Sequence, residues 1–230
     1  MLATIGAASV DDLYRDVPAS VRLRQTVDLP LHQGELAVER EIASLAARNR
    51  PAGSMASFLG AGAYRHHVPA SVDHLIQRGE FLTSYTPYQP EVTQGTLQML
   101  FEFQTQVALI SVIEVANASM YDGATSAAEA VLMANRVTKR RKAILSGGLH
   151  PHYRDVIETY GSWTGFSTKA AAADVTGSED LTGMIDAETS CVVVQNPSVF
   201  GHIRDYSALA AAAQQAGAFL VVVVTEAVSD

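Results

Sequence analysis

The chain has 230 residues, of which 48% are hydrophobic and 17% charged, and its formal net charge is −8. Such a composition is typical of a soluble globular protein with a substantial core, and the negative charge argues against general binding to nucleic acids or anionic membranes. The longest apolar run, Ala216 to Val224, is too short to cross a bilayer. The segment from Met1 to Val10 does not resemble a signal peptide, so we expect a cytoplasmic protein.

The first part of the chain predicts an N-terminal helical arm, residues 1–56. Helices are expected over residues 11–17, 34–48 and, beyond the arm, about 70–78. Pro18 ends the first of these, and Gly79 stops the third.

Two longer helices are expected next, over residues 96–112 and 123–137. Apolar residues of the first cover more than one face, so this helix is predicted to be buried on several sides. The second is rich in alanine, which lets neighbouring elements approach closely.

From residue 143 onward, short apolar runs alternate with helical segments. Strands are expected over residues 143–145, 168–175, 191–195 and 218–224, with helices over 150–160, 180–185 and 206–216. Continuous valine-rich strands alternating with helices are typical of a parallel sheet covered on both faces. Residues 57–230 are therefore predicted to form a doubly wound, mostly parallel α/β domain. Because Asp230 follows the last strand almost at once, we expect this domain to be truncated.

The segment Ser84 to Gly95 is the most informative stretch of the chain. It holds two tyrosines, two glutamines, a glutamate and two prolines ahead of a helix. Pro87 and Pro90 fix their own φ angles and bias the residues before them towards extended geometry, so the polar groups are held in place. Either the loop belongs to a binding site, or its polar groups satisfy the backbone where a helix begins.

Each of three other polar segments has two possible interpretations. Tyr121 to Ser126 is either an anion-binding helix start or an ordinary capped helix. His150 and His152 follow a strand end, where they either contact a bound ring or begin a helix. Gln195 to Gly201 follows another strand, and its amides either fix a ligand or build a turn.

The remaining candidate groups point away from metal and thiol chemistry. His66 and His67 follow a glycine-rich segment, but being adjacent they point apart and lack a third ligand, so they are either substrate contacts or structural residues. Cys191 lies in an apolar run without a neighbouring base and is predicted to be a core thiol. The cluster Lys139 to Lys142 suits a helix C-terminus. The only lysines are Lys139, Lys142 and Lys169, and none follows a strand end in polar company.

Taken together, these motifs resemble the glycine cleavage system P-protein family, in particular its N-terminal half, which in many bacteria is a separate subunit 1. The similarity extends over essentially the whole chain. It is carried by Phe58 to Tyr64, His66 to Pro69, Ser84 to Glu91, Gln94 to Gln98, Phe101 to Thr105, Ala118 to Thr125 and Gln195 to Pro197.

The resemblance implies a pyridoxal-phosphate enzyme of fold type I, the aspartate aminotransferase-like fold, acting as glycine dehydrogenase (decarboxylating). In that reaction the cofactor ring is the electron sink when carbon dioxide leaves glycine, and the aminomethyl group passes to the lipoyl arm of the H-protein. In the two-subunit form, a heterotetramer, the lysine that holds the cofactor belongs to subunit 2. This chain, having no such lysine, is expected to be inactive alone and to complete its partner's site.

By the same resemblance, the expected contributors to the substrate and cofactor site come chiefly from the proline-containing loop. They are Tyr85, Thr86, Tyr88, Gln89, Glu91 and Gln94, followed by Tyr64, His66, His67, Asp122 and Thr125. No catalytic residue and no metal ligand is assigned. Two alternatives stay open: a non-catalytic subunit whose loop serves only docking, and a fragment of an independent fold-type-I aminotransferase.

Overall fold

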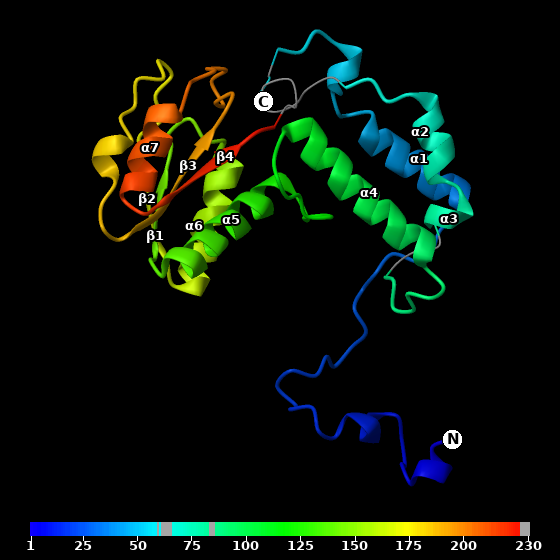
Figure 1. Ribbon diagram of the computed structural model, residues 1–230. Helices are drawn as coiled ribbons and strands as arrows, with labels where there is room; N and C mark the ends of the chain where they lie inside the picture. The colour runs from blue at the N-terminus through cyan, green and yellow to red at the C-terminus, as the bar shows by residue number, and fades with distance from the viewer. Residues whose placement is uncertain (59, 61–65, 83–85, 226–230) are drawn as a thin grey trace. The chain divides into compact units, whose positions relative to one another are not determined.

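The computed structural model describes residues 1–58, 60, 66–82 and 86–225, which divide into two units after Ser57 (Figure 1). The first unit contains one α-helix, α1 (Glu35–Ala46), and short 3-10 turns at Ala3–Ile5, Asp11–Tyr14 and Ala52–Ser54. No residue of α1 is buried. The helix predicted over residues 11–17 is therefore wrong in type and length, because the backbone there closes i to i+3 bonds such as Leu13 N–H to the Val10 carbonyl at 3.1 Å.

The second unit begins with three helices that precede the sheet in the chain. They are α2 (Ala70–Ile76), α3 (Gly79–Leu82) and α4 (Gln94–Ser111). The sequence did not predict α3. The preceding helix ends before Gly79, as expected, and the Leu82 N–H then donates to the Arg78 carbonyl at 3.0 Å and closes a new turn.

Helix α4 corrects a second expectation. It was predicted to be buried on several sides, yet no residue of α4 is buried in this chain. Phe101 and Leu109 are 71% and 74% exposed. Leu97, Leu100 and Val107 are half-buried, but no described element of this chain buries the face that carries Phe101 and Leu109. None of the described helices is long and apolar enough to cross a membrane.

The remainder of the unit is a four-stranded parallel sheet in the order β2-β1-β3-β4. Its strands are β1 (Lys142–Leu145), β2 (Ser167–Ala170), β3 (Thr189–Gln195) and β4 (Phe219–Val223). The connecting helices are α5 (Gly123–Thr138), which precedes β1, α6 (Pro151–Thr164) and α7 (Ser207–Gln215), with a 3-10 turn, η4, at Thr182–Met184.

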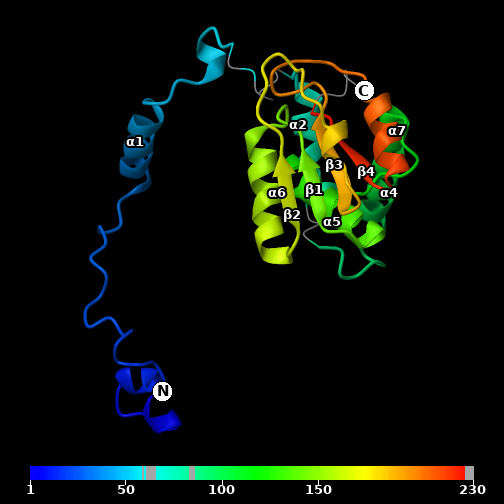
Figure 2. The same ribbon diagram turned by 90° about the vertical axis from the view of Figure 1, so that its left-hand side faces the viewer.

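Successive side chains of each strand point to opposite faces of the sheet and form two separate cores. Ala143 and Leu145 of β1, with Cys191 and Val193 of β3, pack against α5 and α6 on one face. Ile144, Val192 and Val194 point to the opposite face, where Leu181 and Leu209 cover them. The two helical layers lie on opposite sides of the sheet, with α6 on one side and α7 on the other (Figure 2). The predicted doubly wound α/β architecture is confirmed.

Two predicted elements are shorter in the structure. Strand β2 ends at Ala170 rather than at residue 175, because the Asp174 carboxylate accepts hydrogen bonds from the N–H groups of Thr176 and Ser178, at 2.8 and 2.7 Å, and forms a turn. The helix expected over residues 180–185 is the 3-10 turn η4.

Candidate functional site

The loop before α4 is held by its own backbone. The Tyr88 N–H donates to the Thr86 carbonyl at 2.8 Å, and the Gln89 carbonyl accepts from the N–H groups of Val92 and Thr93, at 3.0 and 3.2 Å. The Thr93 hydroxyl adds a third bond to the same carbonyl at 3.0 Å. The segment from Thr86 to Thr93 is therefore a closed turn that leads directly into α4.

The side chains that this turn carries are exposed. Tyr88 is 83% exposed, and Thr86, Gln89, Glu91 and Gln94 are exposed as well. Among the described residues, no hydrogen bond or ion pair engages any of these five side chains. The interpretation in which the polar side chains satisfy the backbone therefore does not hold for them, since main-chain atoms and Thr93 do that work. Tyr85 and Tyr64 lie outside the described residues, whereas His66 and His67 are described and exposed.

A second group of polar residues lies where the parallel strands end, at their carboxyl edge. The Gln195 Oε1 atom, at the end of β3, accepts from the His150 N–H at 2.8 Å. His150 in turn caps α6, its Nδ1 atom accepting from the His152 N–H at 3.1 Å. Asn196 Oδ1 accepts from the Arg204 N–H at 3.1 Å. Three side chains predicted only by their position after a strand, those of His150, Gln195 and Asn196, therefore hold the loops after β1 and β3, and His152 takes part through its backbone N–H.

The sequence did not identify Glu179, which is central to this edge. Its carboxylate accepts from the Ser146 hydroxyl and, at 2.8 Å, from the Gly147 N–H, both in the loop after β1. Arg204 Nη1 lies 4.0 Å from Glu179 Oε1, and the Glu179 side chain is only 9% exposed. Arg204 also lies over the Tyr206 ring, and burial raises the pKa of that tyrosine. A glutamate 33 residues after Ser146 carries no local signal of this contact.

The start of α5 contains a complete capping box. Asp122 Oδ1 accepts from the Thr125 N–H at 2.7 Å, and the Asp122 N–H donates to Thr125 Oγ1 at 3.1 Å. The Thr125 N–H and hydroxyl hold the pKa of the Asp122 carboxyl below its usual value, so the carboxylate is ionised. A Cβ at position 123 would lie 2.3 Å from Tyr153 Oη, so a larger residue here would displace that side chain. The geometry accounts for both polar side chains as a helix cap, and their contact with a cofactor stays a prediction.

Cys191 and the histidines offer no reactive or metal centre among the residues described. Cys191 is fully buried, and burial raises the pKa of its thiol to about 11. The expectation of a core thiol is confirmed. No cluster of three or more His, Cys, Asp or Glu side chains suited to a metal ion occurs in the described part of the chain.

These groups form two separate sets in this chain. No hydrogen bond or ion pair among the described residues joins the side chains of the loop before α4 to Asp122, Thr125 or the carboxyl edge of the sheet. The sheet order and its helical layers define the chain as a doubly wound α/β protein, with polar groups gathered where strands end.

Comparison with known families makes the assignment specific. The family model described as glycine cleavage system P-protein matches residues 1–229, and the chain therefore belongs to the P-protein family. A relative from Rhodospirillum centenum, described as probable glycine dehydrogenase (decarboxylating) subunit 1, is 65% identical over the whole chain and is covered over 51% of its own length. A relative of the same description from Caulobacter vibrioides is 62% identical, with the same coverage.

Solved structures agree with this assignment. A glycine decarboxylase (P-protein) of the glycine cleavage system, crystallised in inhibitor-bound form, matches 97% of this chain with a TM-score of 0.80 and 45% identity. The match covers 50% of that protein. A sphingosine-1-phosphate lyase of Burkholderia pseudomallei, 16% identical with a TM-score of 0.58, shares the fold alone. The chain spans about half the length of the curated relatives that it matches.

Proposed function

We propose that this chain is part of subunit 1 of a glycine dehydrogenase (decarboxylating) in the glycine cleavage system, and that it completes a pyridoxal-phosphate site in a lysine-bearing partner, subunit 2. The observation that carries the proposal is the loop from Thr86 to Gln94. Its backbone is internally bonded, while five of its six polar side chains, all but that of Thr93, are exposed and unpaired within the described chain. A fixed loop with unsatisfied polar groups is suited to a ligand supplied from elsewhere.

This chain by itself does not fit covalent attachment of the cofactor. Lys142 is paired with Asp186 at 2.5 Å at the beginning of β1. Lys139 is the C-cap of α5, and Lys169 is exposed on the outer strand β2. The start of α5, where a phosphate group could otherwise bind, already carries the ionised Asp122 carboxylate. No step of the reaction is therefore assigned to a cofactor held by residues 1–230.

The chemistry that the loop can offer is binding and orientation. The Tyr88 hydroxyl and the amide groups of Gln89 and Gln94 donate hydrogen bonds that suit a carboxylate, and the Glu91 carboxylate accepts from an ammonium group. Glycine presents both of these groups. Within the proposal, glycine and the lipoyl arm of the H-protein are the substrates, and the enzyme is a cytoplasmic heterotetramer.

Peptide mapping tests where the cofactor is attached. The full-length protein, alone and assembled with subunit 2, is saturated with pyridoxal phosphate, reduced with borohydride, digested and analysed by mass spectrometry. The reduced cofactor is expected on one lysine of the partner and on none of Lys139, Lys142 and Lys169. A stoichiometric adduct on one of these three lysines contradicts the proposal. An adduct on a later lysine of the same polypeptide indicates instead an independent fold-type-I enzyme.

A further inference from the structure

A cluster of positive charge lies between the end of α5 and the beginning of β1. Residues 136–142 contain five cationic side chains and no acidic one, in a chain whose net charge is −8. Two of these cations are engaged by the fold. Arg140 Nη1 donates to the carbonyls of Thr189 and Ala216, at 2.9 and 2.6 Å, and Lys142 pairs with Asp186. Arg136, Lys139 and Arg141 remain.

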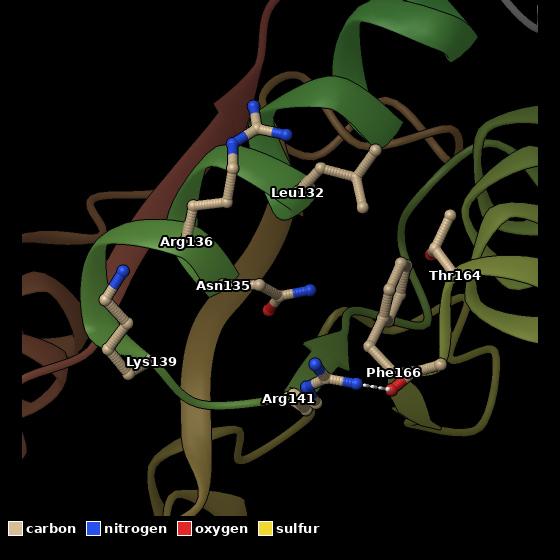
Figure 3. Close-up of a pocket in the computed structure, with 8 residues that line it drawn as sticks. Leu132, Asn135, Arg136, Lys139, Arg141, Thr164 and Phe166 are labelled. Carbon is tan, nitrogen blue, oxygen red and sulfur yellow. Dashed lines mark hydrogen bonds between the residues drawn. The ribbon is translucent and has the colours of Figure 1, made fainter.

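The three remaining cations line one cavity. It has a volume of about 310 Å³ and lies between the C-terminal end of α5 and the junction of α6 with β2. Its other lining residues are Leu132, Asn135, Thr164, Gly165 and Phe166. Figure 3 shows the Asn135 amide on the cavity side of α5, with Arg141, Thr164 and Phe166 across from it. No acidic residue lines the cavity, so its charge is not neutralised locally.

Several hydrogen-bonding groups that line this cavity have no partner among the described residues. The Asn135 Oδ1 atom is buried and has no partner among the described residues. Arg141 makes one hydrogen bond, from Nη1 to the Gly165 carbonyl at 3.3 Å, which leaves its other donors available. In the described part of the chain, neither the Arg136 guanidinium nor the Lys139 ammonium is engaged in an ion pair. A buried polar atom without a partner is costly unless a ligand or water satisfies it.

The position of the cavity separates it from the candidate site. In a parallel sheet, polar groups for catalysis gather at the carboxyl ends of the strands, and Gln195, Asn196 and Glu179 lie at that edge. The cavity lies at the opposite edge, beside Arg141, which immediately precedes β1. Residues lining it are therefore not part of the edge already described.

A favourable interaction with the dipole of α5 explains only some of the cations that line the cavity. Cations near a helix C-terminus are favourable, and Arg136 and Lys139 are in that position on α5. Arg141 lies beyond the helix, and the dipole does not account for the half-buried Asn135 amide, whose buried Oδ1 atom has no partner among the described residues. A ligand that brings both negative charge and hydrogen-bonding groups accounts for all four side chains, the three cations and the Asn135 amide.

We infer that this cavity binds a compact oxyanion of the phosphate class, either free phosphate or the phosphate group of a small ester. Arg141 faces Asn135 as it stands, whereas the exposed side chains of Arg136 and Lys139 extend away from that amide in Figure 3 and turn toward the ligand, so that all three cations pair with the phosphate oxygens. In free hydrogen phosphate the remaining P–OH group donates to Asn135 Oδ1, and in a phosphate ester a hydroxyl of the esterified part does so. The size of the cavity suits a small ligand rather than a nucleic-acid strand or an extended peptide.

Isothermal titration calorimetry with inorganic phosphate tests the inference. The full-length protein is assembled and saturated with pyridoxal phosphate beforehand, so that a cofactor site does not take up the titrant. Saturable binding with one phosphate per chain is expected. The double variant Arg136→Gln/Lys139→Gln is expected to weaken it at least about tenfold, as loss of charge-assisted bonds requires. The matched control Lys169→Gln removes a charge from the exposed residue of β2 and is expected to leave the affinity unchanged.

Further titrations identify the ligand and test whether the loss of binding reflects only the change in net charge. Phosphate monoesters are titrated in parallel, and tighter binding of an ester than of phosphate identifies the source as an esterified metabolite. Asn135→Leu keeps every charge and is expected to weaken binding, whereas Met133→Leu on the exposed side of α5 is not. Absence of saturable binding overturns the inference, as does an equal loss in the cavity variants and in Lys169→Gln. Unchanged circular dichroism spectra show that a lost affinity does not come from unfolding.

Discussion

Replacing Tyr88 by alanine is expected to lower the turnover of the reconstituted full-length enzyme by about a hundredfold, the order of effect typical of a positioned polar group. The physical reason is that Tyr88 is 83% exposed on a turn whose backbone is already bonded. Its side chain is therefore available to a bound ligand, and its removal is expected to leave the stability of this chain unchanged. Steady-state assays with glycine and lipoylated H-protein measure the change.

Two further variants sharpen this prediction. Tyr88→Phe keeps the ring and removes the hydroxyl, so a loss close to that of Tyr88→Ala assigns the effect to the hydroxyl. Trp163→Ala removes another aromatic side chain, 86% exposed on α6, and is expected to leave turnover unchanged. The midpoint of thermal unfolding should be the same for all three variants and the wild type. Wild-type turnover in Tyr88→Ala would exclude the loop from the site.

Substitution of Gly147 by alanine is expected to destabilise the protein by about 3 kcal/mol or more, a large share of a total stability of about 5–15 kcal/mol. A Cβ at this position would lie 2.0 Å from the Ala172 carbonyl oxygen. Since the obstacle is main chain, the loop after β1 must shift, and the bond from the Gly147 N–H to Glu179 is then lost. Chemical denaturation of the full-length protein measures the free energy of unfolding.

A second glycine provides the control for this prediction. At Gly183, in the 3-10 turn η4, an added Cβ would meet only the Asp180 side chain, at 3.4 Å, which is ordinary contact. Gly183→Ala is therefore expected to change the free energy of unfolding by less than about 1 kcal/mol. If Gly147→Ala were equally mild, the close approach of the two loops would be wrong.

The sheet could be predicted from the sequence because its strands carry their own signal. The runs from Cys191 to Gln195 and from Ala218 to Val224 are too apolar and β-branched for an exposed loop, and the helices between strands determine a parallel arrangement. What the pattern did not give was the length of β2 and the turn α3. Both depend on a few hydrogen bonds, to the Asp174 carboxylate and to the Arg78 carbonyl, whose formation local propensity does not report.

The candidate site was only partly predictable for a related reason. The prolines marked the loop before α4 as ordered, and its position before a helix was correct. Glu179 was missed, since its contacts with Ser146 and Gly147 depend on two loops that meet only after the sheet forms. The same limit applies to the cavity beside Arg141. Sequence shows the charges, whereas the unpaired Asn135 amide becomes evident only in three dimensions.

We propose above all that this chain supplies part of a site whose cofactor a partner holds. Decarboxylation of glycine is measured for subunit 2 alone, with wild-type full-length subunit 1, and with the Tyr88→Ala variant, while gel filtration confirms equal assembly. Activity is predicted only in the mixture with the wild type, and the variant mixture is expected to assemble fully yet turn over about a hundredfold more slowly. Full activity of subunit 2 alone would contradict the account, and full activity with Tyr88→Ala would reduce the loop to docking.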